Sequence, residues 1–175
     1  SQHMKELVEQ LLFLARGDSG RNTLNKVKLD LNQMVSEVWE ESQMIDEKHR
    51  YLFRGTDPAY MTGDIAMIKQ SIRIFVQNAA KYSSDGADIT LGVMLESGYV
   101  SYMIQDEGIG MESSDVVHIF ERFYRSDEAR NGETGGSGLG LSIAKWIVDA
   151  HSGTIQVVSR PEIGTRFIVR FPMCE

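Results

Sequence analysis

Two β-rich segments stand side by side in the middle of this 175-residue chain. Ile89–Leu95 and Tyr99–Ile104 are separated only by Glu96-Ser97-Gly98, which is the spacing of a β-hairpin. Two more strand patterns, Thr154–Val158 and Thr165–Phe171, end the chain after a short turn. Hairpin strands pair antiparallel, so the sequence predicts one mostly antiparallel sheet.

Helical periodicity predicts a second layer. The clearest stripe starts at Asp64, is predicted to run to about Lys81, and another helix is predicted from about Leu139 to Ala150. Because strands and helices alternate in blocks, we predict an α+β fold whose sheet is covered on one face by about three helices. The first stripe comprises Ile65, Ile68, Ile72, Phe75, Val76 and Ala79, and an earlier one comprises Leu31, Met34, Val35, Val38 and Ile45.

The first third of the chain holds weaker signals. Lys26–Leu29 reads as a short strand, and Tyr51–Phe53 with Tyr60-Met61 reads as a strand pair. Met4–Ala15 has helical spacing and is followed by turn-forming residues. A helix this short either packs on the domain or ends a longer helix. Residues 1–4 resemble a cleavage scar and are set aside.

Composition excludes several classes of protein. With 42% hydrophobic and 25% charged residues, the chain is in the ordinary globular range. The net charge of −7 argues against nucleic-acid binding, which needs a basic surface. Cys174 is the only cysteine, so a disulfide framework and a cysteine zinc site are both excluded.

Asn78, Lys81 and Tyr82 come at the end of the strongest helix. They are three and four residues apart, so they share one edge of that helix. An amide oxygen suits Mg²⁺, a lysine suits a phosphate, and an aromatic ring suits a purine. For the hexapeptide Asn78-Ala79-Ala80-Lys81-Tyr82-Ser83 by itself, a solvated helix end is the simpler explanation.

Asp106-Glu107-Gly108-Ile109-Gly110-Met111 directly follows a hydrophobic strand. A carboxylate there, beside two glycines that allow close backbone approach, suits the exocyclic amine of adenine. An acidic turn that closes a strand is the alternative.

A glycine-rich run, Gly135-Gly136-Ser137-Gly138-Leu139-Gly140, leads straight into the predicted helix that contains Lys145. Free backbone N–H groups at a helix start attract anions, although a glycine hinge would look similar. Gly140 is followed by Leu141-Ser142, so neither a P-loop nor a dinucleotide fingerprint is present.

These three motifs, in this order, resemble the asparagine box and the two glycine boxes of bacterial sensor histidine kinases. These kinases belong to a superfamily that also includes gyrase, the Hsp90 chaperone and MutL. The resemblance implies its ATP-binding domain, a two-layer α/β sandwich with a mixed sheet. Ile119–Arg125 resembles the phenylalanine box of the kinases, and Gly164-Thr165-Arg166-Phe167 resembles a late small glycine box. The resemblance covers roughly residues 27–172.

The resemblance implies a role for each matched residue. Asp106 would bind the adenine amine, Asn78 would ligate Mg²⁺, Tyr82 would pack against the base, and Lys81 and Arg125 would meet phosphates. We expect Asn78, Lys81 and Arg125 to serve catalysis, and a lid over residues 112–137 to close on the nucleotide. The expected nucleotide-binding set also includes Arg122 and the backbone of Gly108, Gly110, Gly136, Gly138, Leu139 and Gly140.

The implied reaction is transfer of the γ-phosphoryl group of ATP to a histidine. None of His49, His118 and His151 precedes an acidic residue, so the acceptor is expected on a separate dimerisation domain of the same kinase. We read residues 5–20 as the end of a dimerisation helix with its linker, and residues 21–175 as the catalytic domain.

The resemblance also implies partners and a place in the cell. It implies a homodimer for the full-length protein, a response-regulator receiver domain downstream, and a cytoplasmic domain whose parent is anchored in the cell membrane. A nucleotide-responsive module without kinase activity, and an ATPase of the gyrase or chaperone kind, remain the alternatives. Ile74 keeps the first of these open, because many related kinases carry asparagine there and hydrolysing members carry glutamate.

Overall fold

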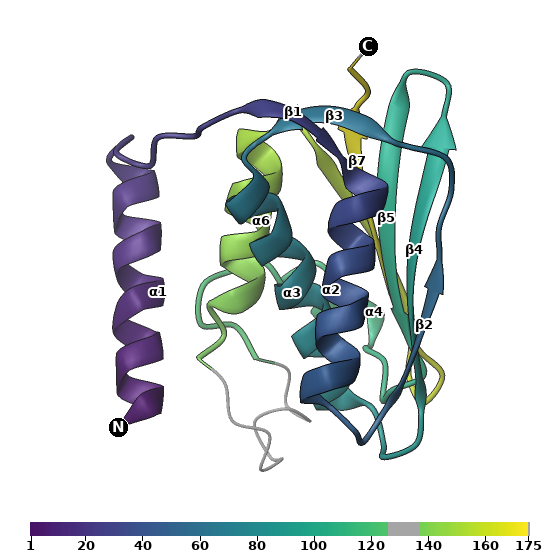
Figure 1. Ribbon diagram of the computed structural model, residues 1–175. Coiled ribbons are helices and arrows are strands. Elements are labelled where there is room, and N and C mark those ends of the chain that lie inside the picture. The colour runs from purple at the N-terminus through teal and green to yellow at the C-terminus, as the bar shows by residue number, and fades with distance from the viewer. Residues whose placement is uncertain (126–136, 175) are drawn as a thin grey trace.

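The computed structural model describes residues 1–125 and 137–174, and its centre is a five-stranded sheet (Figure 1). The strand order is β2-β4-β5-β7-β6, and only the β2–β4 pair is parallel. A separate antiparallel ribbon of β1 and β3 crosses one end of the molecule. The strands are β1 Val27–Asp30, β2 Arg50–Arg54, β3 Tyr60–Gly63, β4 Asp88–Glu96, β5 Tyr99–Asp106, β6 Thr154–Arg160 and β7 Gly164–Pro172.

The predicted hairpin is the centre of the sheet. β4 and β5 pair antiparallel from Ile89 opposite Asp106 to Glu96 opposite Tyr99. β7 then pairs with the other edge of β5, so that Thr165 lies opposite Asp106. This register brings the end of β5 and the start of β7 together, which places two of the sequence motifs side by side.

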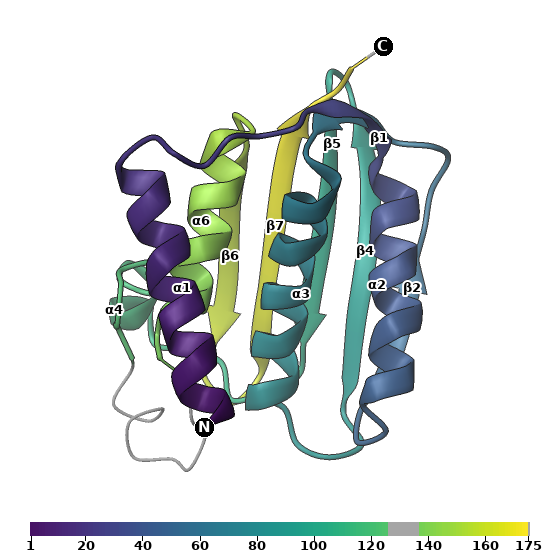
Figure 2. The same ribbon diagram turned by 60° about the vertical axis from the view of Figure 1, so that its left-hand side comes forward.

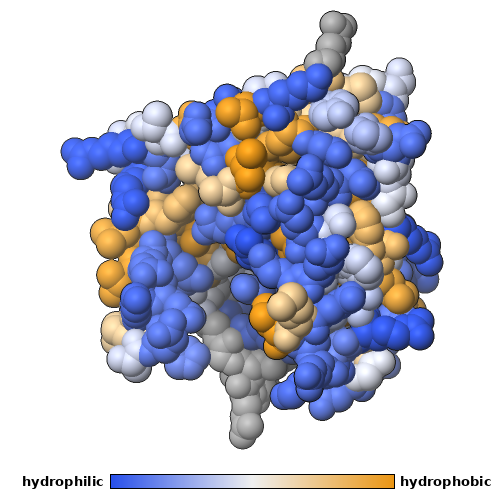
Figure 3. Space-filling model, viewed as in Figure 1, coloured by the Kyte–Doolittle hydropathy of each residue, from blue (hydrophilic) through white to orange (hydrophobic). Residues whose placement is uncertain are grey.

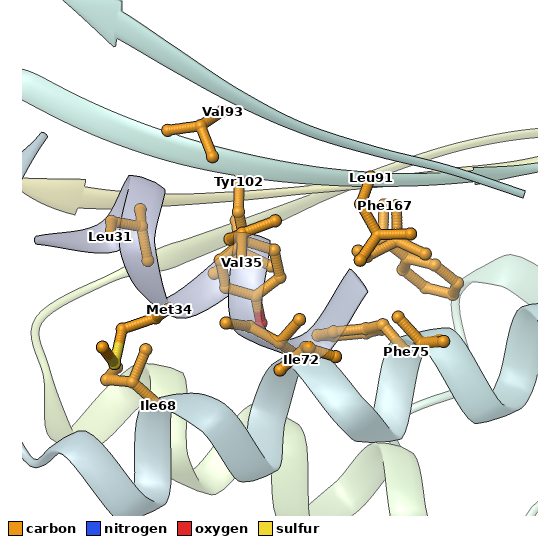
Figure 4. Packing of buried hydrophobic residues seen from close by; sticks show 14 of the residues in the cluster. Leu31, Met34, Val35, Ile68, Ile72, Phe75, Leu91, Val93, Tyr102 and Phe167 are labelled. Atoms are coloured by element: carbon orange, nitrogen blue, oxygen red, sulfur yellow. The ribbon is translucent and has the colours of Figure 1, made fainter. Parts of the chain in front are cut away.

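Three helices cover one face of the sheet, as predicted. They are α2 (Leu31–Ile45), α3 (Ile65–Tyr82) and α6 (Gly140–Ala150), and Figure 2 shows them in front of the sheet, running roughly along the strands. The core fills the space between the layers, where residues of α2 and α3 meet the inward side chains of the strands (Figure 4). Phe75 of α3 packs on Phe167 of β7 at 4.7 Å between ring centroids. The predicted α+β class and two-layer architecture are therefore confirmed.

The predicted pairing of the second and third strands is wrong. β2 pairs in parallel with β4, whereas β3 pairs with β1 in the separate ribbon. The two segments are close in sequence, which favoured a local pair. The structure separates them because Tyr51 is buried at the edge of the main sheet as part of β2, whereas Met61 is buried as part of the β1–β3 ribbon.

Two residues placed on buried stripes are exposed instead. Ile45 is the last residue of α2 and is 78% exposed, while Ile65 is the first residue of α3 and is 43% exposed. Both keep the helical spacing, but they are the terminal residues of their helices, where the rest of the fold leaves the side chains exposed. Periodicity alone predicts which face of a helix is apolar, but not which residues of that face are covered by the rest of the fold.

A fourth long helix, α1 (Gln2–Asp18), lies outside the two layers and packs on α6. It begins inside the segment set aside as a cleavage scar, with Ser1 as its N-cap. A short helix missed by the sequence analysis, α4 (Ser113–Val116), follows the second motif. Across the described ranges, no helix is both long and apolar enough to cross a bilayer.

Candidate functional site

A cavity of about 290 Å³ opens where α1, α3, the end of β5 and the start of α6 meet. It is the place where all three motifs of the sequence analysis converge, although they are separated by up to about 60 residues along the chain. Its lining is both polar and apolar. The lining residues are Gln10, Ile74, Gln77, Asn78, Lys81, Tyr82, Asp106, Ile109, Gly110, Met111, Ile119, Tyr124, Arg125, Ser137, Gly138, Gly140, Leu141 and Thr165.

α3 supplies one wall of this cavity. Ile74, Asn78, Lys81 and Tyr82 lie on one face of the helix, as their spacing predicts, while its buried face anchors the helix on the sheet. The Lys81 Nζ lies 5.6 Å from the centroid of the Tyr82 ring. Burial lowers the pKa of Lys81, and the positive charge of Arg125 lowers it further. Two cationic side chains therefore line the same cavity, which suits an anion.

Asp106 forms the floor of the cavity and is only 5% exposed. Its Oδ1 accepts hydrogen bonds from the backbone N–H of Gly108 at 2.8 Å and of Thr165 at 3.2 Å. Burial raises the pKa of this carboxyl, and the two N–H groups oppose that rise. Because both bonds use the same oxygen, the carboxylate is held in one orientation and Oδ2 remains as the oxygen through which a ligand's N–H would be recognised.

Gly108 and Gly110 have a structural reason to be glycine. A Cβ on Gly108 would lie 2.4 Å from the Tyr82 carbonyl oxygen, and one on Gly110 would lie 1.8 Å from the Arg160 carbonyl oxygen. Gly110 also has a φ of +65°. The sequence predicts that these glycines allow close approach of a ligand, and the structure shows that they also let the loop after β5 pack against α3 and β6.

The start of α6 forms the opposite end of the cavity. Ser137, Gly138 and Gly140 line it, and the Ser137 Oγ accepts a hydrogen bond from the Leu139 N–H at 3.3 Å. The side chain of Leu139 is fully buried away from the cavity in a cluster with Leu14. First-turn N–H groups have no partner within their own helix, so this end suits a negatively charged group.

The remaining predicted site residues divide into three groups. Arg125 lines the cavity, but Arg122 does not; its guanidinium binds Asp18 of α1 through two bonds of 2.8 and 2.7 Å. Gly108 and Leu139 lie beside the cavity rather than in its lining. Gly136 and most of the predicted lid, residues 126–136, lie outside the described residues.

Sequence reasoning missed much of the apolar lining. Ile109, Met111, Ile119 and Leu141 flank motif residues, and ordinary hydrophobic side chains carry no signal that separates a cavity wall from the core. Thr165 had a signal, because it belongs to the late glycine motif, but its hydrogen bond to Asp106 depends on the pairing of β5 with β7.

A metal ion at this site would have few protein ligands. Within residues 1–125 and 137–174, no three histidine, cysteine or acidic side chains gather to hold a cation. The Asn78 amide in the cavity wall is compatible with Mg²⁺, which accepts oxygen ligands and usually combines one or two protein groups with phosphates and water.

Comparison with known proteins decides the family. Residues 63–175 match the family described as histidine kinase-, DNA gyrase B-, and HSP90-like ATPase, which is more than half of the chain. The chain belongs to this ATPase family. The match spans the asparagine motif, both glycine motifs and the late glycine motif, and so includes α3, β5, α6 and β7.

Within this ATPase family, the relatives are sensor histidine kinases. The chain is 38% identical over 169 residues to sensor histidine kinase YkoH of Bacillus subtilis (strain 168), covering 97% of this chain and 37% of that protein. It is 34% identical over 179 residues to sensor histidine kinase WalK of the same organism, covering 100% of this chain and 29% of that protein. The chain thus spans less than half the length of these relatives, and corresponds to the catalytic ATP-binding domain of the kinase branch.

Solved structures of histidine kinases share the fold. Full-length ShkA in complex with AMPPNP aligns with a TM-score of 0.85 at 23% identity, over 98% of this chain and 36% of that one. The mycobacterial sensor histidine kinase MprB aligns with a TM-score of 0.73 at 24% identity, over 84% of this chain and 97% of that one. These likenesses confirm the architecture of the ATPase domain.

Proposed function

We propose that this domain binds Mg-ATP in the cavity and transfers the γ-phosphoryl group to a histidine on the dimerisation domain of the same kinase. The observation that carries the proposal is the convergence of Asp106, Asn78, Lys81 and Arg125 on one cavity in a chain of the histidine kinase-like ATPase family. ShkA, which shares the fold, was solved with AMPPNP. The receiver domain of a response regulator would then take the phosphoryl group from that histidine.

Asp106 would define the adenine end of the site. Its carboxylate would accept the exocyclic N–H of adenine, while the Thr165 and Gly108 amides keep it oriented. Ile109, Met111 and Tyr82 would pack against the base, because apolar side chains stabilise a flat ring that leaves water.

The phosphates would then extend towards Lys81, Arg125 and the start of α6. These groups would neutralise the charge that phosphoryl transfer redistributes, so the chain acts mainly by positioning and electrostatics. Asn78 would be the protein ligand of a magnesium ion, and bound Mg²⁺ would supply charge neutralisation between the phosphates.

The direct test is transfer of label from [γ-³²P]ATP to a separately supplied dimerisation domain. We expect labelling of its histidine, with acid-labile and base-stable phosphate, by the wild-type chain and by Asp149→Asn, which changes an exposed aspartate on α6. At an ATP concentration near the wild-type Kd, we expect much weaker labelling by Asp106→Asn, because its lower affinity leaves most of the sites empty. Equal labelling by Asp106→Asn would remove Asp106 from the site.

A second candidate is a nucleotide-responsive module without kinase activity. Ile74 favours it, because the structure places this isoleucine in the cavity wall one turn before Asn78, where a polar group would be expected to orient the reacting atoms. The same assay separates the two: ATP binding by calorimetry without transfer to the supplied domain would support the silent module.

A further inference from the structure

One wall of the cavity comes from α1, which lies outside the matched segment. Gln10 of α1 lines the cavity, and its Oε1 accepts a hydrogen bond of 2.7 Å from the Ser137 Oγ. Ser137 also accepts from the Leu139 N–H. The Gln10 carboxamide is therefore next to the start of α6, at the end of the cavity opposite the floor made by Asp106.

Contacts of α1 with α6 fix the position of Gln10, and Leu7, on its N-terminal side, packs against the same cluster as Leu14. Leu14 is 2% exposed and packs in a cluster with Leu139, Ile143 and Ile147 of α6 and its cap. The rings of Phe13 and Trp146 meet edge to face at 5.3 Å. Trp146 also packs against the backbone of Gly17, where an added Cβ would lie 2.5 Å from its Nε1.

The C-terminal end of α1 is tied down as well. Asp18 binds Arg122 through two hydrogen bonds, and the Asn22 Nδ2 donates to the Phe13 carbonyl oxygen at 2.9 Å. α1 is thus held along most of its length, with Gln10 as the polar residue that faces the cavity. By contrast, hydrophobic side chains gather at the outer edge of the molecule on the side of α1 (left in Figure 3). Val8, Leu11 and Leu12 of this helix are exposed.

We propose that Gln10 is a nucleotide-binding residue, which α1 contributes to the phosphate end of the site. This inference rests on the proposed ATP-binding function. Because Ser137 occupies the oxygen of the carboxamide, the group that Gln10 offers to a ligand is its NH₂ donor, and an amide donor pairs with a phosphate oxygen. The ligand class is a nucleoside di- or triphosphate, since adenosine alone would not reach this end.

The contact between Gln10 and a bound nucleotide would couple nucleotide binding to the docking of α1 on α6. If α1 contributes a donor to the phosphates only while it is docked on α6, nucleotide binding stabilises the docked helix, and docking raises nucleotide affinity by the same factor. The nucleotide site would then respond to a rotation or displacement of the helix that precedes the domain.

Gln10→Glu tests the inference with a nearly isosteric change. A carboxylate still accepts from Ser137, so docking of α1 is retained, but the NH₂ donor is lost and a negative charge faces the phosphates. We expect the affinities for ATP and ADP to fall about tenfold or more, and the affinity for adenosine to stay unchanged. Titration calorimetry with the three ligands measures this directly.

Gln2→Glu is the matched control. It makes the same charge change on the same helix, about 12 Å from Gln10 along the helix axis. At that distance salt screens most of the interaction between the new charge and a phosphate. Docking of α1 is followed through Trp146 fluorescence in a Trp39→Phe background, because Trp146 packs on Phe13 and Trp39 is the only other tryptophan. Gln10→Ala, which removes the donor without adding charge, should lose less affinity than Gln10→Glu.

Each result of these titrations either supports or overturns the role proposed for Gln10. Equal ATP affinities in wild type and Gln10→Glu would overturn the role of Gln10 while leaving ATP binding intact. A parallel loss of ATP and adenosine affinity would also overturn it, because that loss would reflect general damage to the pocket. Absence of ATP binding by the wild type would overturn the proposed function itself.

Discussion

At the scale of single residues, Asp106 shows how function and stability oppose each other. It is a carboxylate in a 5% exposed position whose pKa is raised by burial, so ionising it costs free energy in the folded state. A group of this kind contributes most to stability when protonated. Burial therefore makes the charge of Asp106 costly to the fold, and recognition of a ligand's N–H would give that charge a role.

Asp106→Asn should lower ATP affinity about 10- to 100-fold without lowering stability. The amide can accept from Gly108 and Thr165, but it loses a charge-assisted bond to adenine. Calorimetry measures the affinity and urea unfolding at pH 7 measures stability. A variant that bound ATP normally, or that unfolded much more easily than wild type, would contradict this account.

His151 predicts a stability change below neutral pH. Its Nδ1 donates to the Ile147 carbonyl oxygen, and its Nε2 accepts from the Asp64 N–H at 3.0 Å, so the neutral ring is required. Burial lowers the pKa of His151 from its usual value of 6.5. Since the folded-state pKa is below the unfolded one, the contribution is present above about pH 6.5 and is lost as pH falls through the folded value.

The measurement compares unfolding free energies at pH 7.5 and pH 5.5. Wild type and His3→Gln, a change at an exposed histidine of α1, should lose more stability on acidification than His151→Gln does. The same slope in all three proteins would rule out His151 as the source.

At the scale of elements, the loop after β5 depends on close backbone packing. Gly110→Ala would place a Cβ 1.8 Å from the Arg160 carbonyl oxygen at a residue with φ of +65°. We expect a loss of about 2–5 kcal/mol in unfolding free energy. Gly98→Ala is the control, because Gly98 also has positive φ but no atom within 4 Å of a Cβ, and should cost about 1–2 kcal/mol.

From the cavity-facing side chains of α3, we predict a domain that transfers the γ-phosphoryl group of ATP but does not hydrolyse ATP. Ile74 faces the cavity one turn before Asn78 and can neither orient water nor accept a proton. We therefore expect ATP to bind with negligible turnover by the isolated domain, measured as phosphate release over hours. Many turnovers, or a requirement for Ile74→Asn before any transfer to a supplied dimerisation domain, would show that this view of Ile74 is wrong.

At the scale of the whole molecule, His49, His118 and His151 are not placed to accept a phosphoryl group from this cavity. His49 and His151 are engaged through both ring nitrogens, and His118 pairs with Glu121; none of the three lines the cavity. We expect no acid-labile label on this chain after incubation with [γ-³²P]ATP. Label on His49, His118 or His151, located by mass spectrometry, would be the contrary result.

The sequence by itself determined most of the helices and strands and predicted several of the residues that meet at the cavity. Local periodicity gave the hairpin of β4 and β5 and the buried faces of α2 and α3, because the spacing of apolar residues along a helix or strand depends only on local geometry. It also placed Asn78, Lys81 and Tyr82 on one helix edge, since residues three and four apart share a face.

Only the tertiary structure decided how those pieces meet. β2 pairs with β4 rather than with β3, its neighbour in sequence, because strand partners depend on burial over the whole sheet and not on the local pattern. The pairing of β5 with β7 likewise brings the Thr165 N–H to the Asp106 carboxylate. Arg122 binds Asp18 instead of lining the cavity, and Gln10 of α1 is part of the cavity lining. Such contacts join residues about 100 or more positions apart, and the sequence near either partner carries no trace of the other, because packing of separate elements in space creates the pair.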